Sequence, residues 1–126
     1  MPTGAPMPSF DGFNVGDVIK VPFPYTDRAT RQRRPALIVS TYDLERDHGL
    51  LWVLMITSAE NRGWPGDVPV TAPANAGLPV PSVIRTAKIA TIEARDAELL
   101  GKVRPAVIAA VARRLAAILG LNERNG

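Results

Sequence analysis

Short apolar runs separated by turn-forming residues constrain the fold of this chain more than any other feature. The runs lie at residues 16–24, 35–40, 50–57, 68–71 and 83–92. They are rich in β-branched and aromatic residues, and Pro, Gly, Asn and Asp separate them, as is typical of strands joined by turns. The runs 35–40 and 50–57 are apolar at almost every position, so we predict central strands that are buried on both faces. The pattern of runs up to residue 92 therefore predicts a series of five or six short strands.

One convincing helix follows at the C-terminal end, over residues 105–119. Pro105 suits the first helical position, and Gly120 suits the residue that ends a helix. A helix of this kind must bury its apolar stripe on a sheet face, which predicts the α+β class: a small, strongly bent antiparallel sheet or barrel with a C-terminal helix. The stripe has the spacing of a helix face and consists of Val107, Ile108, Val111, Leu115, Ile118 and Leu119.

Length and composition favour one compact domain. The chain has 126 residues, of which 46% are hydrophobic, enough for one core. Residues 1–14 are rich in Pro and Gly and are predicted to be a flexible lead-in, residues 15–122 to be the single domain and residues 123–126 to be a short tail. The lead-in lacks the basic start and apolar centre of a signal peptide, and no apolar run is long enough to span a bilayer. We therefore predict a cytoplasmic protein with no membrane partner.

The residue types that are scarce exclude several classes of function. The sequence has no cysteine, which excludes disulfide scaffolds, thiolate zinc sites and cysteine nucleophiles. His48 is the one histidine, so no mechanism can use two imidazoles. No metal-ligand spacing or phosphate-binding glycine loop occurs, and we predict neither metal nor cofactor. Twelve of the fifteen basic residues are arginine, whose planar forks suit phosphate and carboxylate, so a nucleic acid or an acidic peptide is the favoured partner.

Two candidate site features lie at the ends of the predicted central strands. Arg33 and Arg34 come directly before Pro35, where extended backbone would hold Arg34 in a defined direction. Thr57 and Ser58 end the next strand along the chain. If the two strands are antiparallel, the exit of one lies beside the entrance of the other, and Thr57 comes close to Arg34. The alternative for the arginines is solvated charge that flanks an apolar strand, and for Thr57 and Ser58 it is ordinary turn chemistry.

Further candidates lie in the segment 58–92. Arg85 and Lys88 share the strand predicted at 83–92, and alternation would place them on opposite faces unless a bulge intervenes. Their alternative role is to protect an edge strand by charge. Trp64, in the loop 58–67, either stacks on a nucleic-acid base or folds back onto the barrel. Trp52 lies in an apolar strand and is predicted to be a core residue.

Several motifs occur together in a characteristic order: "GDVIKVPFPYTD", "RRPALIVS", "MITS" and "GLPVPSVIRTAKIATI", followed by the C-terminal helix. In order and spacing they resemble the MazF/PemK family of toxin endoribonucleases, over roughly residues 15–120. The resemblance implies a small SH3-like β-barrel with a C-terminal helix, usually a homodimer. It also implies metal-independent cleavage of single-stranded RNA at short sequences and neutralisation by a cognate acidic antitoxin.

The resemblance also implies roles for individual residues. Arg34 of the "RP" step and Thr57 of the "ITS" strand end match the central catalytic pair of the family, and Arg85 in "SVIR" matches a third catalytic residue of one branch. An arginine fork and a hydroxyl suit the chemistry, because attack by the RNA 2′-hydroxyl forms a phosphorane whose charge needs hydrogen-bond donors. The products would be a 2′,3′-cyclic phosphate, or its 3′-phosphate, and a 5′-hydroxyl. The predicted RNA-binding residues are Arg31, Arg33, Ser58, Lys88 and Trp64.

One departure from the family pattern concerns the general base. Many relatives carry Asp or Glu two residues after the "VIR" arginine, whereas this chain has Ala87. Arginine is a poor base at neutral pH, so the proton acceptor is unassigned. Asp27 is the candidate base, with Asp17 and Glu60 as substitutes. Otherwise Arg34 and Thr57 act mainly by electrostatics, or the chain is a weak or inactive nuclease.

Two other functions are compatible with a fold of this kind. A non-catalytic SH3-like module would hold nucleic acid or an acidic peptide in an arginine-lined groove, and Ala87 favours this alternative. The other is a gyrase poison, because the CcdB family shares the fold; resemblance to that family would imply an aromatic residue and small residues at the extreme C-terminus. The ending "NERNG" does not offer this combination, so the gyrase alternative is disfavoured.

Overall fold

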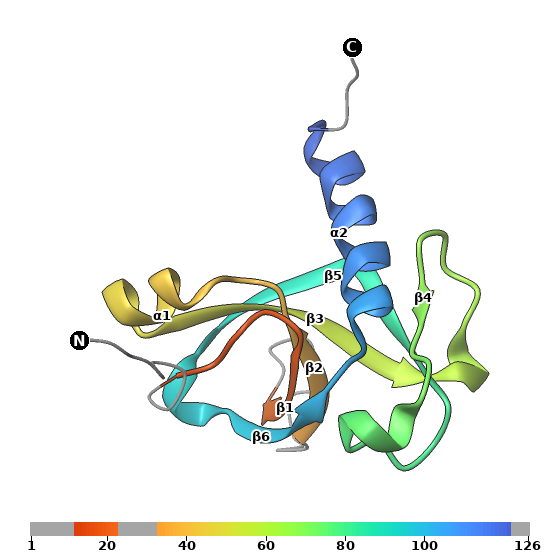
Figure 1. Ribbon diagram of the computed structural model, residues 1–126, viewed down its shortest axis with the longest axis horizontal. Helices are drawn as coiled ribbons and strands as arrows, with labels where there is room; N and C mark the ends of the chain where they lie inside the picture. The colour runs from red at the N-terminus through yellow and green to blue at the C-terminus, as the bar shows by residue number, and fades with distance from the viewer. Residues whose placement is uncertain (1–11, 23–32, 122–126) are drawn as a thin grey trace.

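The computed structural model describes residues 12–22 and 33–121. These residues form a six-stranded sheet with the strand order β4-β5-β3-β2-β1-β6, in which every paired strand is antiparallel. The sheet curls into a half-barrel, and helix α2 stands against one face (Figure 1), which confirms the predicted α+β fold. The strands are β1 Asp17–Pro22, β2 Arg33–Ile38, β3 Leu50–Ser58, β4 Val68–Pro69, β5 Ser82–Glu93 and β6 Glu98–Lys102; the α-helices are α1 Tyr42–His48 and α2 Pro105–Leu119; and the 3-10 turns are η2 Ala59–Asn61, η3 Pro73–Ala76 and η4 Ala94–Asp96.

The core lies on both faces of the curled sheet. Val18 and Leu37 belong to one buried cluster, which α2 covers through Val107. Their chain neighbours Ile19 and Ile38 belong to a second cluster on the other face. Successive strand residues point to opposite faces, so these strands need apolar residues at consecutive positions. This arrangement confirms the prediction that the central strands are buried on both faces.

Strand β5 contains the irregularity that shapes the site. Leu54 of β3 pairs with Ile89, but the next residue, Met55, pairs with Arg85. The segment Thr86–Lys88 is therefore extra on β5 and forms a bulge. An odd number of inserted residues reverses the alternation of side chains on the two sides of a bulge. The sequence predicted opposite faces for Arg85 and Lys88 unless a bulge intervened, and the structure contains this bulge.

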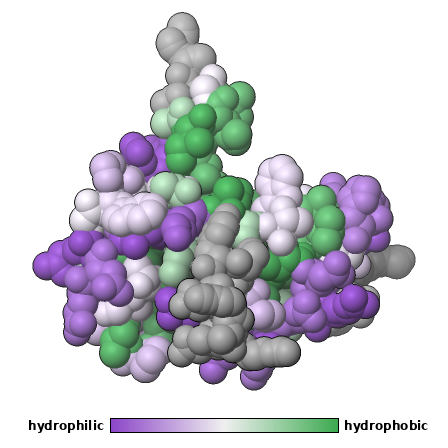
Figure 2. Space-filling view, turned by 180° about the vertical axis from the view of Figure 1, so that it is seen from behind, coloured by the Kyte–Doolittle hydropathy of each residue, from purple (hydrophilic) through white to green (hydrophobic). Residues whose placement is uncertain are grey.

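Helix α2 has the predicted start and stop, but its predicted burial is only half right. Gly120 caps it in the left-handed conformation, with φ of 74°. Val107 and Val111 are buried against the sheet, whereas Ile118 and Leu119 are 55% and 66% exposed. The C-terminal turns extend past the edge of the sheet, and Figure 2 shows hydrophobic surface on this projecting part. The apolar stripe is thus longer than the sheet face that the monomer offers.

The sequence prediction missed helix α1. The segment Tyr42–His48 was expected to be turn material, but it forms two turns of helix between β2 and β3. Asp43 and Glu45 in its first turn and Arg46 and His48 in its last turn complement the helix dipole. Gly49 ends the helix in the left-handed conformation, so the end signals were present although the apolar periodicity was not.

The prediction that Trp52 is a core residue is wrong. Its side chain is 49% exposed, while its neighbours Leu51 and Val53 are buried in the second cluster. Trp52 therefore lies on the other face of β3. Helix α2 packs on that face against the cluster that contains Leu54, and Trp52 does not belong to this cluster. Of the predicted lead-in and tail, residues 1–11 and 123–126 lie outside the described residues.

Candidate active site

A cleft of about 500 Å³ opens where β2 begins and β3 ends. Lys20 and Arg34 are the cationic residues of its lining, which also contains apolar residues such as Leu78 and Val80. No acidic residue of the described chain lines the cleft, so its charge is positive. Its lining consists of Lys20, Arg34, Pro35, Ile56, Thr57, Ser58, Asn61, Gly77, Leu78, Pro79, Val80, Ser82 and Leu100.

Arg34 and Thr57 meet in this cleft, as the sequence predicted. Strands β2 and β3 are antiparallel, with Ala36 opposite Met55, and the same register carried two residues further places Arg34 opposite Thr57. Among the described residues, the Arg34 Nε is a buried donor with no hydrogen-bond partner. A buried unsatisfied donor is costly unless a ligand or water satisfies it. The cleft therefore offers an anion a guanidinium and a hydroxyl from adjacent strands.

The Thr57 hydroxyl is held by a residue that the sequence reasoning missed. The Asn61 side-chain Nδ2 donates a hydrogen bond to Thr57 Oγ1 at 3.0 Å. Ser58 Oγ accepts the backbone N–H of Glu60 at 3.2 Å and caps the one-turn η2 helix that carries Asn61. The spacing from Thr57 to Asn61 was visible in the sequence, but a polar loop residue has no pattern that distinguishes it from its neighbours.

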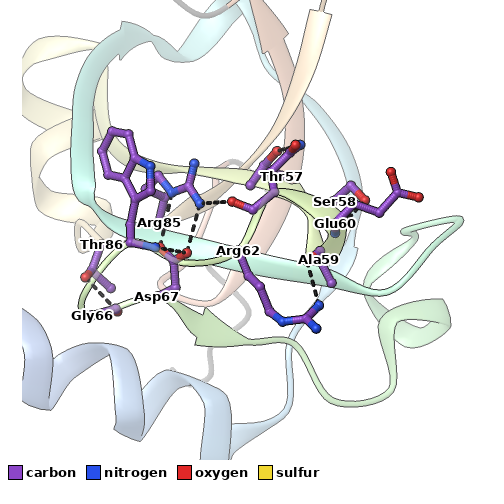
Figure 3. A network of polar contacts seen from close by, with 11 residues as sticks. Thr57, Ser58, Ala59, Glu60, Arg62, Gly66, Asp67, Arg85 and Thr86 are labelled. Carbon is purple, nitrogen blue, oxygen red and sulfur yellow. Dashed lines mark hydrogen bonds and ion pairs between the residues drawn. The ribbon is translucent and has the colours of Figure 1, made fainter.

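Arg85 does not line the cleft; its guanidinium is bound within the adjacent loop (Figure 3). Its Nε donates to Asp67 Oδ1 at 3.1 Å and its Nη2 donates to Asp67 Oδ2 at 2.9 Å. Both side chains are 8% exposed. The hydrogen bond from Arg85 is the main cause that holds the pKa of Asp67 below its ordinary value, with the nearby positive charge adding to it. Burial of the pair pushes the Asp67 pKa the other way and is outweighed.

Trp64 packs on two cations from β5. The Arg85 Cζ lies 4.3 Å from the centroid of the Trp64 ring, and the Lys88 Nζ lies 5.6 Å from it. Both distances are within the range of cation–π attraction. The bulge in β5 explains how two residues of opposite parity reach one ring. Trp64 remains 44% exposed, so an open part of its surface is available to a partner.

The remaining sequence candidates divide into three groups. Arg31 and Asp27 lie outside the described residues. Arg33 is exposed and connects β1 to η4, because its Nη2 donates to the carbonyl oxygens of Lys20 and Asp96. Asp17, Glu60 and Ala87 are not among the residues that line the cleft. Asp17 is buried and accepts a hydrogen bond from Lys102 at 3.0 Å, whereas Glu60 and Ala87 are exposed.

No group of three His, Asp or Glu side chains within residues 12–22 and 33–121 could hold a metal ion. No helix in the same part of the chain is long and apolar enough to cross a membrane.

The fold and the cleft together define a class: a small, curled antiparallel sheet with one C-terminal helix and a positively charged cleft that contains an arginine. A family model described as "PemK-like, MazF-like toxin of type II toxin-antitoxin system" matches residues 14–119. The chain therefore belongs to the PemK-like, MazF-like toxin family of type II toxin–antitoxin systems. A search of curated proteins gave no significant match.

Several solved structures share this fold. The chain is similar to a chain in the crystal structure of MazE–MazF from Deinococcus radiodurans, with 25% identity, a TM-score of 0.70, and 88% of this chain and 98% of that chain covered. MazF from the same organism gives 26% identity, a TM-score of 0.70, and coverage of 86% and 97%. The Mycobacterium tuberculosis toxin MazF-mt6 gives 24% identity, a TM-score of 0.64, and coverage of 83% and 98%.

Proposed function

We propose that this toxin is a metal-independent endoribonuclease that cleaves single-stranded RNA. The observation that carries the proposal is the meeting of Arg34, with its unsatisfied Nε, and Thr57 in a cleft that no acidic residue of the described chain lines. A similar structure described as an endoribonuclease in complex with its cognate antitoxin, from a mycobacterial species, supports the activity class.

The reaction needs few protein groups because RNA supplies its own nucleophile. The 2′-oxygen bonds to the adjacent phosphorus and its proton passes to a base, while the bond from phosphorus to the 5′-oxygen breaks and that oxygen gains a proton. The phosphorane that forms between these steps carries extra negative charge on its non-bridging oxygens. Arg34 and Thr57 donate hydrogen bonds to those oxygens, and donors placed in this way are commonly the largest single contribution to such catalysis.

Of the three sequence candidates for the general base, one is excluded by its contacts. Asp17 is buried and bound to Lys102, so it is not the base. Glu60 is exposed and adjoins Asn61, which lines the cleft. Asp27 and Glu60 are therefore the two residues to test, and an enzyme that tolerates the loss of both works by electrostatic stabilisation alone.

The substrate and partners follow from the charge and the exposed surface. The cations Lys20 and Lys88 and the open face of Trp64 suit an RNA strand, which such proteins bind by phosphate contacts and base stacking. The exposed end of α2 suits a homodimer contact. The MazE–MazF complexes of Deinococcus radiodurans support a cognate antitoxin as inhibitor, and an acidic chain segment would complement this cleft.

A cleavage assay tests the proposed function. Purified protein is incubated with a long single-stranded RNA in EDTA, and new 5′-hydroxyl ends are mapped by their failure to ligate until they are phosphorylated. We expect cleavage at a short recurring sequence and growth arrest on expression. Salt-dependent RNA binding without any product would instead establish the non-catalytic module, the alternative that Ala87 favours.

A further inference from the structure

The loop between β3 and β4 connects Arg85 to Thr57 through a single residue, Asn61. We infer that Asn61 is a positioning residue that directs the proton of the Thr57 hydroxyl into the cleft, and that Arg85 and Asp67 act on the site by holding Asn61. The inference rests on the proposed ribonuclease function and adds to it a residue that touches a proposed catalytic group.

The direction of the hydrogen bond between Asn61 and Thr57 determines where the Thr57 hydroxyl proton can point. Asn61 Nδ2 donates to Thr57 Oγ1 at 3.0 Å, and both residues line the cleft. A hydroxyl has one hydrogen and two lone pairs. When the amide occupies a lone pair, the hydroxyl hydrogen must point elsewhere and is available to an acceptor in the cleft. A non-bridging oxygen of the phosphorane requires a donor of this kind.

The second step is the way in which Asn61 is held. The Arg85 Nη2 donates to the Asn61 backbone oxygen at 2.8 Å (Figure 3). The same guanidinium is fixed by two hydrogen bonds to Asp67 and by stacking against Trp64. A fork bound on three sides in a nearly buried position has little freedom to move. Arg85 therefore fixes the backbone that carries the amide.

This arrangement gives Arg85 a role different from the one that the family resemblance implies. A catalytic arginine would direct its guanidinium at the reacting phosphate, whereas the Nε and Nη2 of Arg85 are bound to Asp67 and Asn61, and Arg85 is not among the residues that line the cleft. Arg85 is thus a positioning residue that acts through Asn61. The effect of losing it should therefore depend on Thr57.

The test exchanges the donor of Asn61 for an acceptor of the same shape. In Asn61→Asp, the Thr57 hydroxyl donates to the new carboxylate and no longer to the substrate. The single-turnover rate constant at saturating RNA should fall about 100-fold, the usual effect of losing one oxyanion donor. Asn61→Ala frees the hydroxyl without capturing its proton and should lower the rate constant about tenfold, because the hydroxyl then samples several directions.

A double-mutant cycle and a charge control separate positioning from general damage. In a Thr57→Val background, Asn61→Asp should lower the rate constant less than about twofold further, because its effect runs through the hydroxyl. Asn75→Asp adds the same charge at an exposed position of η3 outside the cleft lining, and it should leave the rate constant within about twofold of the wild type. Thermal melting of each variant reports whether the fold is retained, and Asn61→Ala enters the same cycle if Asn61→Asp does not fold.

Each outcome has one meaning. Wild-type activity in Asn61→Asp, or an undiminished loss when it is added to Thr57→Val, would overturn the positioning role and leave the ribonuclease function intact. A wild-type protein that cleaves no RNA would overturn both. A loss that disappears in the Thr57→Val background establishes the role.

Discussion

Arg85 and Asp67 form a nearly buried, two-point ion pair although they lie on different segments, one on β5 and one in the loop before β4. The pair closes the loop that follows Ser58, the last residue of β3, and the Arg85 guanidinium also holds the backbone of Asn61. One ion pair thus connects the stability of the loop with the geometry of the cleft.

Removing the carboxylate of this pair should destabilise the protein in a pH-dependent way. At pH 7, Asp67→Asn should lower the free energy of unfolding by roughly 3 kcal/mol, because Arg85 is left buried without its counter-charge. The pKa of Asp67 is lowered in the folded state, so the contribution of the carboxylate is complete above about pH 4, the ordinary range of aspartate, and is lost as the pH falls further. Denaturant unfolding of both proteins between pH 7 and pH 2 measures this difference.

The matched control for this experiment is Asp43→Asn. Asp43 is exposed and pairs with Arg46 on the surface of α1. Its loss should change the free energy of unfolding by less than about 0.5 kcal/mol. A difference between wild type and Asp67→Asn that stays constant down to pH 2 would contradict the assignment.

Arg34 should be required for cleavage but not for folding. Arg34→Ala removes the fork that faces the phosphate and should lower the cleavage rate constant by about 100-fold or more. Arg34→Lys should recover little of it, because a lysine cannot donate two parallel hydrogen bonds. Arg95→Ala removes an exposed arginine outside the cleft and should cleave at the wild-type rate. Equal losses in Arg34→Ala and Arg95→Ala would mean that only overall charge matters.

Arg33, the neighbour of Arg34, should behave in the opposite way with respect to stability. Its guanidinium donates to two backbone oxygens, on β1 and η4. Arg33→Ala should therefore lower the free energy of unfolding by about 1 kcal/mol, as expected for partly exposed hydrogen bonds. Arg34→Ala should leave the stability unchanged or raise it, since it removes a buried unsatisfied donor. Urea denaturation of the two variants checks the contrast.

Trp64 should contribute to RNA binding by stacking. Trp64→Ala should weaken RNA binding by about fivefold to 100-fold, the range found when one stacked base is lost, and Trp64→Phe should restore part of it. Trp52→Ala is the control, because Trp52 is also exposed but lies near the start of β3, whereas the cleft is lined by residues at the end of that strand. Fluorescence anisotropy with a labelled single-stranded RNA at fixed salt measures both. Equal weakening by the two variants would contradict a specific role for Trp64.

The two halves of α2 should respond differently to substitution. Val111 is buried, so Val111→Ala should lower the free energy of unfolding by about 2 kcal/mol through lost burial and a cavity. The pair Ile118→Ser and Leu119→Ser lies on the exposed end and should leave monomer stability almost unchanged while weakening self-association. Sedimentation equilibrium over a range of protein concentrations distinguishes the effects, and a dimer that withstands both substitutions would place the contact elsewhere.

Much of this molecule could be predicted from local patterns in the chain. The apolar runs predicted the central strands, and their consecutive apolar residues predicted burial on two faces, because strand side chains alternate. Pro105 and Gly120 predicted both ends of α2. Antiparallel pairing of neighbouring strands was enough to bring Arg34 and Thr57 to one place.

The tertiary structure decided what each side chain contacts. Trp52 and Trp64 are both exposed, but distant elements give them different surroundings: Trp52 lies outside both buried clusters, and the β5 bulge brings Arg85 and Lys88 to the ring of Trp64. The partner of Arg85 could not be predicted, because Asp67 lies 18 residues away and reaches it only when the loop folds back. The periodicity of a sequence indicates which side chains share a face of one element. The environment of a charged side chain depends on which distant segments of the chain fold against it. The sequence by itself thus determined the central strands, helix α2 and the neighbouring positions of Arg34 and Thr57. Only the packing of those elements decided that Arg34 faces an open cleft while Arg85 is bound.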